Sequence, residues 1–424
     1  MNKPPRSTLV TVAAAAIAGL VGVLLSVFGP AGDAEAATGI RVSNGRVYEA
    51  NGNEFVMRGV NHAHAWYPGQ TGAIADIAAK AANTVRIVLS SGDRWTRTST
   101  SEVSSLIGQC KANKLICVLE VHDTTGYGED SAATSLDKAA DYWISVKSAL
   151  EDQENYVVIN IGNEPFGNTG YSAWTDATKN AIGRLRSAGL HHALMVDAPN
   201  WGQDWSHTMK DNAASVFDAD PDHNTIFSIH MYGVYDTATE VQDYLNHFVD
   251  NHLPIVVGEF GDQHSDGNPD EDAIMATAQS LKVGYIGWSW SGNGSGVEYL
   301  DMVGNFDASA LSSWGNRFFN GSNGISQTST TATVYGGGSG DGGSGGGTAP
   351  NGYPYCASSS SDPDGDGWGW ENNQSCVVRG SSADTGSGGG TDGGTAPNGY
   401  PYCASSSSDP DGDGWGWENN QSCV

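Results

Sequence analysis

Short apolar runs rich in β-branched residues recur along residues 37–321 and alternate with amphipathic stretches. Eight of these runs are predicted strands: Phe55–Asn61, Thr84–Leu89, Cys117–His122, Val157–Glu164, Leu194–Ala198, Ile226–Tyr232, Ile255–Phe260 and Tyr285–Trp290. Runs this short and this apolar are typical of buried parallel strands. The clearest predicted helices between them are Ala73–Ala82, Ser101–Lys114, Leu136–Glu151, Ser172–Ala188, Ala238–Asn251 and Glu271–Ser280.

The regular spacing of the runs predicts how the strands are arranged. Eight strand-and-helix units in about 285 residues are expected of an α/β fold of the (β/α)8 TIM barrel type. The stretch Ile40–Glu54, with turns at Asn44-Gly45 and Asn51-Gly52, predicts a hairpin that covers the bottom of the barrel. An open doubly wound sheet is the alternative, but no glycine-rich phosphate loop follows the first strand.

The first 36 residues have the pattern of a secretory signal peptide. Lys3 and Arg6 precede an apolar segment, and Ala34-Glu35-Ala36 offers small residues at a cleavage site. We therefore expect a secreted protein that has no contact with a membrane after cleavage. A membrane anchor is the alternative, because the apolar segment has a borderline length for a span. Gly29-Pro30 and the cleavage site favour the signal peptide.

The composition changes abruptly near Asn320. Residues 322–347 and 379–394 are rich in Gly, Ser and Thr and are predicted to be flexible linkers. Residues 348–377 recur without change at 395–424. The chain thus has a predicted catalytic domain at 37–321 and two small modules at 348–378 and 395–424.

The net charge and the cysteines limit the partners and the compartment. The formal net charge is −28 and the basic residues do not cluster, which argues against nucleic acid and anionic membranes and suits a neutral polysaccharide. Six cysteines in an exported chain predict disulfides, and proximity suggests the pairs Cys110–Cys117, Cys356–Cys376 and Cys403–Cys423. Two free thiols are the alternative for the first pair. We expect a monomer that requires no cofactor.

Polar and aromatic residues gather at the C-terminal ends of the predicted strands, where barrel enzymes place their active sites. They are Asn61, His62, His64, Trp66, Arg86, His122, Asp123, Asn163, Glu164, Asn200, Trp201, His230, Tyr232, Glu259, Trp288 and Trp290. Packing of a core alone would not collect such residues at one rim.

Two strand-end glutamates carry the candidate chemistry. Glu164 and Glu259 end the fourth and seventh predicted strands, so their side chains should face each other across the barrel mouth. Two facing carboxyls hydrolyse glycosides with retention when they lie about 5–5.5 Å apart, one as nucleophile and one as acid/base. Asn163 can then hydrogen-bond the substrate 2-hydroxyl.

The neighbours of the two glutamates suggest different roles for them. A buried Arg86 near Glu259 would keep that carboxyl ionised, which suits a nucleophile. Tyr232 and His230 could orient it. Glu164, which is less shielded, is then expected to be the acid.

The two glutamates stand in the motifs Asn163-Glu164-Pro165 and Gly258-Glu259-Phe260. These resemble, respectively, the acid/base and the nucleophile motif of glycoside hydrolase family 5 in clan A. The positions that fall where the family keeps its site residues are Arg86, His122, His230, Tyr232 and Trp288. Longer stretches resemble secreted actinobacterial endo-β-1,4-mannanases: His62–Trp66, His122–Gly126, Ala198–Gly202 and Gly287–Gly294.

The resemblance covers residues 37–321 and implies a secreted retaining endo-β-1,4-mannanase that acts on β-mannan of plant cell walls. The same chemistry on cellulose or another β-1,4-glucan is the nearest alternative. A non-catalytic polysaccharide-binding protein is a more distant one, because it would need one glutamate to be missing.

Other candidate residues have an ordinary structural explanation beside the functional one. Trp66, Trp201 and Trp288 are predicted to stack on sugars, with Trp288 at the cleavage point, although buried tryptophans could also be core. His62 is expected to form hydrogen bonds, because no third ligand accompanies it and His64 as zinc requires. The run Asp270-Glu271-Asp272 is either an acidic helix start or a surface calcium site.

Each repeated module is too small to fold without its cysteine pair. Its aromatic residues are predicted to bind sugar faces: Tyr353, Tyr355, Trp368 and Trp370 in the first copy, and Tyr400, Tyr402, Trp415 and Trp417 in the second. Residues 367–376 and 414–423 resemble carbohydrate-binding module family 10, although the opening part of that family is missing. This implies binding to cellulose or mannan, with two copies raising avidity.

Overall fold

The computed structural model describes residues 39–336, Tyr353 and the short segments 367–371, 374–378, 416–418 and 421–423. The predicted signal peptide at 1–36 and most of the two modules lie outside the described residues. Across the described residues, no helix is both long enough and apolar enough to cross a membrane.

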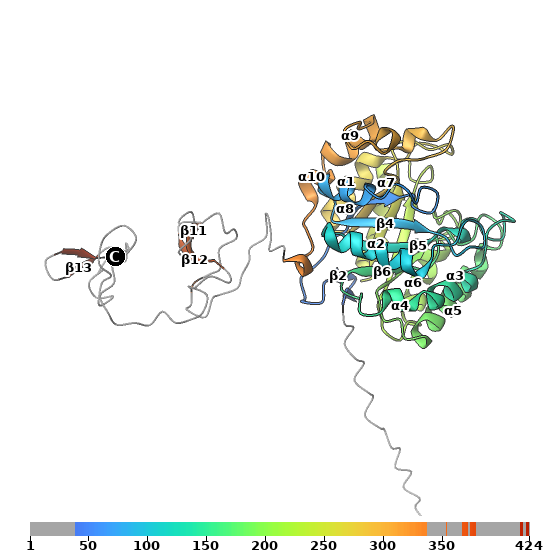
Figure 1. Ribbon diagram of the computed structural model, residues 1–424, viewed down its shortest axis with the longest axis horizontal. Coiled ribbons are helices and arrows are strands. Elements are labelled where there is room, and N and C mark those ends of the chain that lie inside the picture. The colour runs from blue at the N-terminus through green and yellow to red at the C-terminus, as the bar shows by residue number, and fades with distance from the viewer. Residues whose placement is uncertain are drawn as a thin grey trace, which may run out of the picture. The chain divides into compact units, whose positions relative to one another are not determined.

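Eight parallel strands close into a barrel, with helices packed around the outside (Figure 1). In order around the barrel the strands are β3 (Arg58–His62), β4 (Thr84–Leu89), β5 (Ile116–Val121), β6 (Val157–Asn160), β7 (Leu194–Asp197), β8 (Thr225–Met231), β9 (Ile255–Phe260) and β10 (Gly284–Gly287), which pairs with β3. All of their residues are buried, as strands covered on both faces must be. The predicted (β/α)8 fold is confirmed.

The helices of the barrel domain follow the strands in alternation, as predicted. They are α1 (Ala73–Ala79), α2 (Thr100–Ala112), α3 (Leu136–Ser145), α4 (Lys147–Leu150), α5 (Trp174–Ser187), α6 (Thr208–Phe217), α7 (Ala238–Asp250), α8 (Glu271–Leu281), α9 (Ser313–Asn320) and α10 (Ile325–Thr328). Polar side chains begin several of them: Ser99 and Glu102 form a capping box at α2, and Ser135 caps α3.

The predicted hairpin lies at the bottom of the barrel. Strand β1 (Arg41–Ser43) pairs antiparallel with β2 (Arg46–Tyr48). Val42 and Val47 pack against a cluster of side chains that fills the barrel interior near the N-terminal ends of the strands. The buried members of that cluster are Ile40, Phe55, Met57, Ile116, Val118, Val158, Ala193, Met195, Ile226, Val256, Ile286 and Ala332.

The predicted boundary of the domain at residue 321 is wrong. Residues 322–336, which we call the C-terminal strap, fold back onto the barrel instead of starting a linker. Ile325 is buried in α10, and Ala332 joins the cluster at the barrel bottom. The Glu49 carboxylate accepts hydrogen bonds from the Thr333 and Val334 amides at 2.9 and 2.8 Å. The Ser- and Thr-rich composition of this segment conceals its few apolar anchors.

The predicted disulfide between Cys110 and Cys117 is also wrong. Both side chains are free thiols buried between α2 and β5, and the Cys110 thiol donates a hydrogen bond to the Cys117 sulfur. The alternative of two free thiols, one of them in a strand, is the one that holds.

Parts of both modules fall within the described residues. Strand β11 (Trp368–Glu371) pairs antiparallel with β12 (Gln374–Val377), and β13 (Gly416–Glu418) with β14 (Gln421–Cys423). Tyr353 and Trp368 meet edge to face at 4.9 Å and are 47% and 37% exposed. Cys376 is bonded in a disulfide. The following lie outside the described residues: Tyr355, Cys356, Tyr400, Tyr402, Cys403, Trp415 and the side chains of Trp370, Trp417 and Cys423.

Candidate active site

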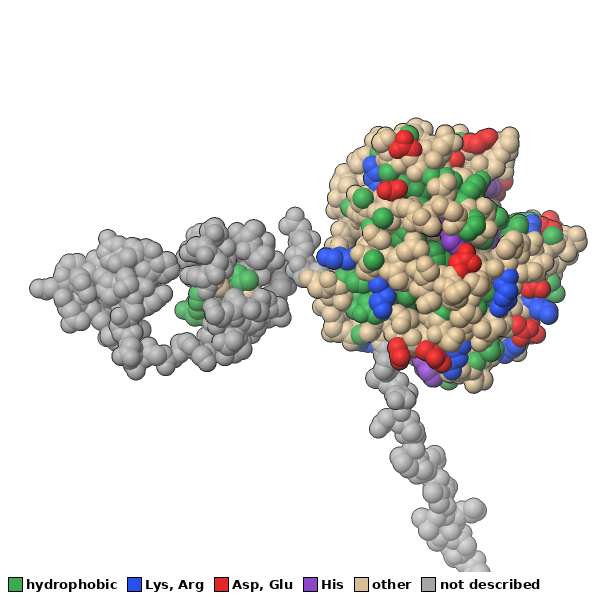
Figure 2. All heavy atoms as spheres, viewed as in Figure 1, with side chains coloured by type: hydrophobic (Ala, Val, Ile, Leu, Met, Phe, Trp, Pro, Cys, Tyr) green, Lys and Arg blue, Asp and Glu red, His purple; other side chains and the backbone are tan. Residues whose placement is uncertain are grey.

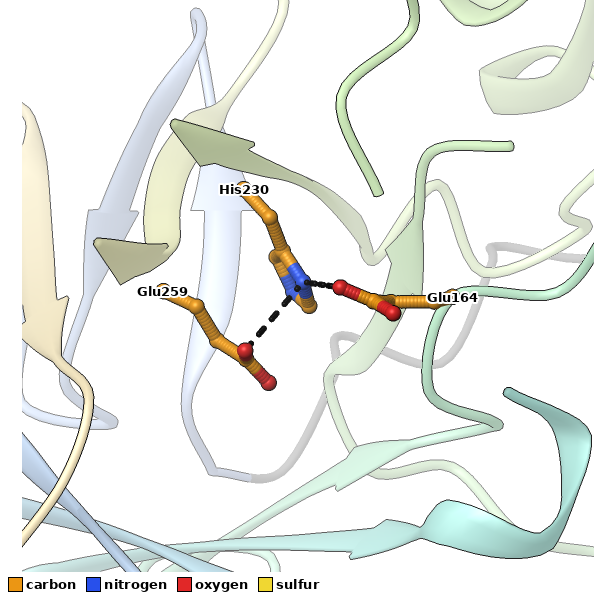
Figure 3. A group of neighbouring side chains, drawn as sticks. All are labelled: Glu164, His230 and Glu259. Carbon is orange, nitrogen blue, oxygen red and sulfur yellow. Dashed lines mark hydrogen bonds and ion pairs between the residues drawn. The ribbon is translucent and has the colours of Figure 1, made fainter. Parts of the chain in front are cut away.

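Glu164 and Glu259 face each other at the mouth of the barrel (Figure 3). Glu259 lies in β9, and Glu164 follows the end of β6 by four residues. The ring of His230 stands between them, with Nδ1 2.8 Å from Glu164 Oε1 and 3.6 Å from Glu259 Oε2. Ligating atoms of all three side chains lie within 4.8 Å of one another. Such proximity fits the pair of a retaining enzyme and not the pair of an inverting one, which is about 6.5–9.5 Å apart.

The backbone at Glu164 adopts a left-handed conformation, with φ of +39°. Such a conformation costs about 1–2 kcal/mol for a residue with a Cβ and is typical of functional sites. Neighbouring loops hold it in place: the Glu164 carbonyl accepts from the Gly126 amide at 3.0 Å, and the Glu164 amide donates to Asp197 at 3.4 Å. This turn ends β6 earlier than predicted and aims the glutamate into the mouth.

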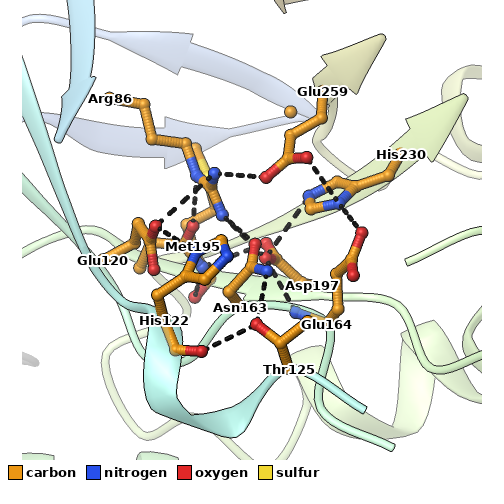
Figure 4. Close-up of polar contacts among 12 residues, drawn as sticks. Arg86, Glu120, His122, Thr125, Asn163, Glu164, Met195, Asp197, His230 and Glu259 are labelled. Atoms are coloured by element: carbon orange, nitrogen blue, oxygen red, sulfur yellow. Dashed lines mark hydrogen bonds and ion pairs between the residues drawn. The ribbon is translucent and has the colours of Figure 1, made fainter. Parts of the chain in front are cut away.

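Arg86 lies fully buried at the centre of the polar network (Figure 4). Its guanidinium donates five hydrogen bonds of 2.7–3.0 Å, to Asn61, Asn160, Asn163, Asp197 and Glu259. A guanidinium has five N–H donors, so Arg86 has none left for a substrate. It holds the site together and does not bind sugar.

The two oxygens of Glu259 are held by different donors. Arg86 Nη1 donates to Oε1 at 2.7 Å, and the Tyr232 hydroxyl donates to Oε2 at 3.1 Å. Tyr232 therefore orients Glu259 as expected, but the hydrogen bond of His230 goes to Glu164. Burial raises the pKa of Glu259, and the positive charges of His230 and Arg86 oppose this rise without cancelling it. Arg86 thus favours the ionised form as predicted, while burial has the larger effect.

His230 is buried among carboxylates that favour its charged form. Burial disfavours its charged form, but the nearby Glu259 and Asp197 carboxylates outweigh this and raise the pKa of His230 to about 10. The cluster of Glu164, His230 and Glu259 is the one among the described residues with spacing that could hold a metal ion. A protonated imidazole is a poor metal ligand, so the trio fits acid–base chemistry better.

Two buried carboxylates, Glu120 and Asp197, belong to the network but were missed from the sequence. Glu120 in β5 accepts from His122 Nδ1 at 2.8 Å, and this raises the pKa of His122 against the effect of burial. Asp197 ends β7 beside Arg86. Burial opposes its ionisation, yet Arg86 and His230 lower the pKa of Asp197 to about 2. The signal for Asp197 was an acidic residue at the end of an apolar run, as for Glu164.

Aromatic rings form one wall of the mouth. Trp288, just beyond β10, stacks on the His122 ring at 5.8 Å between centroids. Trp66 meets His122 edge to face at 4.9 Å and Trp95 at 5.3 Å. The sequence pointed to Trp66, His122 and Trp288 but not to Trp95, which lies in a loop after β4.

A cavity of about 270 Å³ opens on the other side of Glu164. Its lining is Glu164, Asn168, Asn200, Trp201, Gln203, Trp205, Tyr232, Val234, His264 and Asp266. Trp201 donates to Glu129 at 3.1 Å. Trp205, which could equally have been a core residue by sequence, is 48% exposed and donates to Asn168 at 2.7 Å. Both indoles are thus held with part of their surface open to solvent.

Comparison with known proteins places this geometry in a family. Residues 48–294 match the model of the family described as cellulase (glycosyl hydrolase family 5). The chain belongs to glycosyl hydrolase family 5. Residues 346–378 and 392–424 of this family 5 hydrolase each match a model described as a cellulose or protein binding domain, in agreement with the predicted modules.

The family 5 hydrolase is similar to several bacterial mannanases. It is 76% identical to a mannan endo-1,4-beta-mannosidase of Streptomyces lividans, over 89% of this chain and 99% of that protein. The corresponding enzyme of Cellvibrio japonicus is 55% identical, over 71% and 70% of the two chains. The solved structure of a beta-mannanase from Thermomonospora fusca matches with a TM-score of 0.70 and 61% identity, over 70% of this chain and all of that one.

Two further candidate sites of the family 5 hydrolase differ in what the structure shows of them. His62 is buried against His64 and Phe306, its Nδ1 atom has no hydrogen-bond partner among the described residues, contrary to the prediction, and burial lowers the pKa of His62 to about 3. Asp270 caps α8 by accepting from the Ala273 amide, and Asp272 pairs with Arg317. The acidic helix start is therefore what the structure shows, and calcium binding at this run stays a prediction.

On the face shown in Figure 2, Lys and Arg are scattered among the acidic side chains, with histidine and apolar side chains between them.

Proposed function

We propose that the protein is a secreted retaining endo-β-1,4-mannanase that hydrolyses internal bonds of β-mannan. The chemistry rests on the separation of Glu164 and Glu259 and on their different partners. The choice of mannan rests on the similarity to the Streptomyces lividans enzyme along nearly its whole length.

In the first step Glu259 attacks the anomeric carbon while Glu164 gives its proton to the glycosidic oxygen. A covalent bond forms between the sugar and Glu259, and the bond to the leaving sugar breaks. In the second step Glu164 takes a proton from water, the water oxygen attacks the anomeric carbon, and Glu259 is released. Arg86 and Tyr232 hold Glu259 in position through both steps.

Asn163 is suited to recognise the sugar at the cleavage point. Its carbonyl accepts from Arg86 at 2.7 Å, and its amide nitrogen donates to Thr125 at 2.9 Å. An amide group has two N–H donors, so one N–H is left for the substrate. Fixing its direction in advance favours a hydrogen bond to the 2-hydroxyl that strengthens in the transition state.

The two modules extend the proposal from catalysis to targeting. Tyr353 and Trp368 expose aromatic surface in the first module, and such surface marks binding sites. We propose that both modules bind cell-wall polysaccharide, including cellulose, and that two copies raise the avidity for an insoluble polymer.

Release of reducing sugar from galactomannan and from carboxymethyl-cellulose tests the proposed function. We expect greater activity on galactomannan, and we expect Glu259→Ala to lose essentially all of it. Greater activity on carboxymethyl-cellulose would show that the enzyme is a glucanase of the same family. Retained activity in Glu259→Ala would show that another residue is the nucleophile.

A further inference from the structure

Asp197 takes part in none of the chemical steps above, yet it contacts the parts that do (Figure 4). The side chain is buried at the end of β7. Its Oδ1 atom accepts from Asn160 at 3.0 Å. Its Oδ2 atom faces three donors: Arg86 Nη2 at 3.0 Å, the Glu164 amide at 3.4 Å and His230 Nε2 at 3.4 Å.

The first link from Asp197 to the acid/base is through the backbone. Glu164 has a left-handed φ, which is unfavourable for a side chain that bears a Cβ. The Asp197 carboxylate accepts a hydrogen bond from the Glu164 amide at 3.4 Å, a long contact in which the negative charge attracts the N–H. Asp197 therefore helps to hold the unfavourable turn that aims Glu164 at the leaving group.

The second link runs through the ring of His230. Nδ1 bonds Glu164 at 2.8 Å, and Nε2 faces Asp197 at 3.4 Å. A neutral imidazole has a single N–H, whereas the imidazolium has two and can serve both carboxylates. The Nε2 contact with Asp197 is an ion pair and not a hydrogen bond. The Asp197 charge thus favours the imidazolium form of a ring whose Nδ1–H points at Glu164.

We propose that Asp197 is the positioning residue of Glu164, acting through the Glu164 amide and the His230 ring. This inference rests on the proposed function, in which Glu164 is the acid/base. Asp197 also contacts Arg86, which holds Glu259. An effect through Arg86 and Glu259 would slow the hydrolysis of every substrate. An effect through Glu164 would slow only the hydrolysis of substrates whose leaving group needs a proton.

Two substrates with the same kind of reacting sugar separate these routes. Mannopentaose has a sugar leaving group that must be protonated, whereas the dinitrophenolate of 2,4-dinitrophenyl β-mannobioside leaves without help. The ratio kcat/KM reports the first chemical step for both. For Asp197→Asn we expect kcat/KM on mannopentaose to fall about tenfold or more, as for loss of part of a general acid's contribution. On the dinitrophenyl substrate it should fall less than about threefold.

A double variant tests whether Asp197 acts through Glu164. Once Glu164→Ala has removed the acid, adding Asp197→Asn should cost no further activity on mannopentaose, because residues that act as a unit are not additive. His230→Gln removes one of the two links but also a positive charge beside Glu259, so kcat/KM should fall on both substrates and fall further on mannopentaose. It also keeps the inference testable if Asp197→Asn fails to fold.

Asp220→Asn is the matched control. Asp220 is another buried aspartate that pairs with an arginine, Arg186, at 2.8 Å, and no contact joins it to the catalytic glutamates. Asp220→Asn should lower the melting temperature and leave unchanged the ratio of kcat/KM on mannopentaose to kcat/KM on the dinitrophenyl substrate. The inference would be overturned if Asp197→Asn lowered kcat/KM equally on both substrates. It would also be overturned if the losses from Asp197→Asn and Glu164→Ala added in the double variant. Failure of the unaltered enzyme on both mannosides would instead overturn the proposed function.

Discussion

Replacement of Arg86 by lysine should destabilise the protein strongly, although it preserves the charge. The guanidinium donates five hydrogen bonds to five different side chains inside the barrel. A lysine ammonium has three donors, so at least two buried acceptors must lose a partner. Each buried acceptor left without a donor costs about 1–3 kcal/mol. Arg86→Lys should therefore lose about 2–6 kcal/mol of the free energy of unfolding.

A loss of that size is large beside the total stability of about 5–15 kcal/mol for a domain. It is measurable by urea unfolding followed by tryptophan fluorescence, with the melting temperature as a second readout. The kcat/KM on mannopentaose should fall as well, because Glu259 loses the donor that fixes Oε1.

Arg184→Lys provides the comparison. Arg184 also pairs with two carboxylates, Asp137 and Asp141, but its side chain is 30% exposed and water can replace its hydrogen bonds. Its replacement should change the stability by less than about 0.5 kcal/mol. If the two variants had the same free energy of unfolding, the reasoning that each buried hydrogen bond of Arg86 contributes to stability would be refuted.

Two further predictions concern the strap and the buried histidine. Glu49→Gln should lower the free energy of unfolding by about 1–3 kcal/mol and speed proteolysis within residues 322–336, because Glu49 holds Thr333 and Val334. The control is Glu151→Gln, which changes an exposed glutamate. Equal cleavage rates in the two variants would contradict this prediction. For His230, a folded-state pKa of about 10 lies above the ordinary 6.5, so its stabilising contribution is complete below about pH 6.5 and is lost as the pH rises through about 10. Between about pH 7 and 10 the melting temperature should therefore fall more steeply in the unaltered protein than in His230→Asn; parallel curves would show that His230 is not a buried cation.

The sequence could predict the parts of the site that break the apolar pattern at the end of a strand. Glu164 and Glu259 stand out because a carboxylate at the end of a buried run is unfavourable without a reason. Barrel geometry then places strand ends at one rim. Asp197 has the same signature, but it stands one residue before the predicted end of its strand at Ala198, and the observed strand ends at Asp197 itself.

Other features depend on three-dimensional contacts that local patterns do not contain. Glu120 lies inside a strand, and whether it points into the barrel depends on the alternation set by its neighbours. The strap is held by four apolar side chains in a segment whose average composition is that of a linker: Ile325, Ala332, Val334 and Tyr335. The hydrogen bond of His230 to Glu164 could not be predicted for a similar reason, since a ring between two carboxylates can contact both.

The strap also determines how the domain would bear a mechanical load. Tension carried along the chain from beyond residue 336 must enter the barrel domain through the strap. There the Tyr335 hydroxyl donates to the Leu115 carbonyl at 2.7 Å, and Glu49 holds two successive amides. These contacts lie at the N-terminal ends of the strands, at the opposite end of the barrel from the catalytic glutamates. A pull from a module anchored on a polymer would thus act first on the N-terminal end of the barrel, away from Glu164 and Glu259.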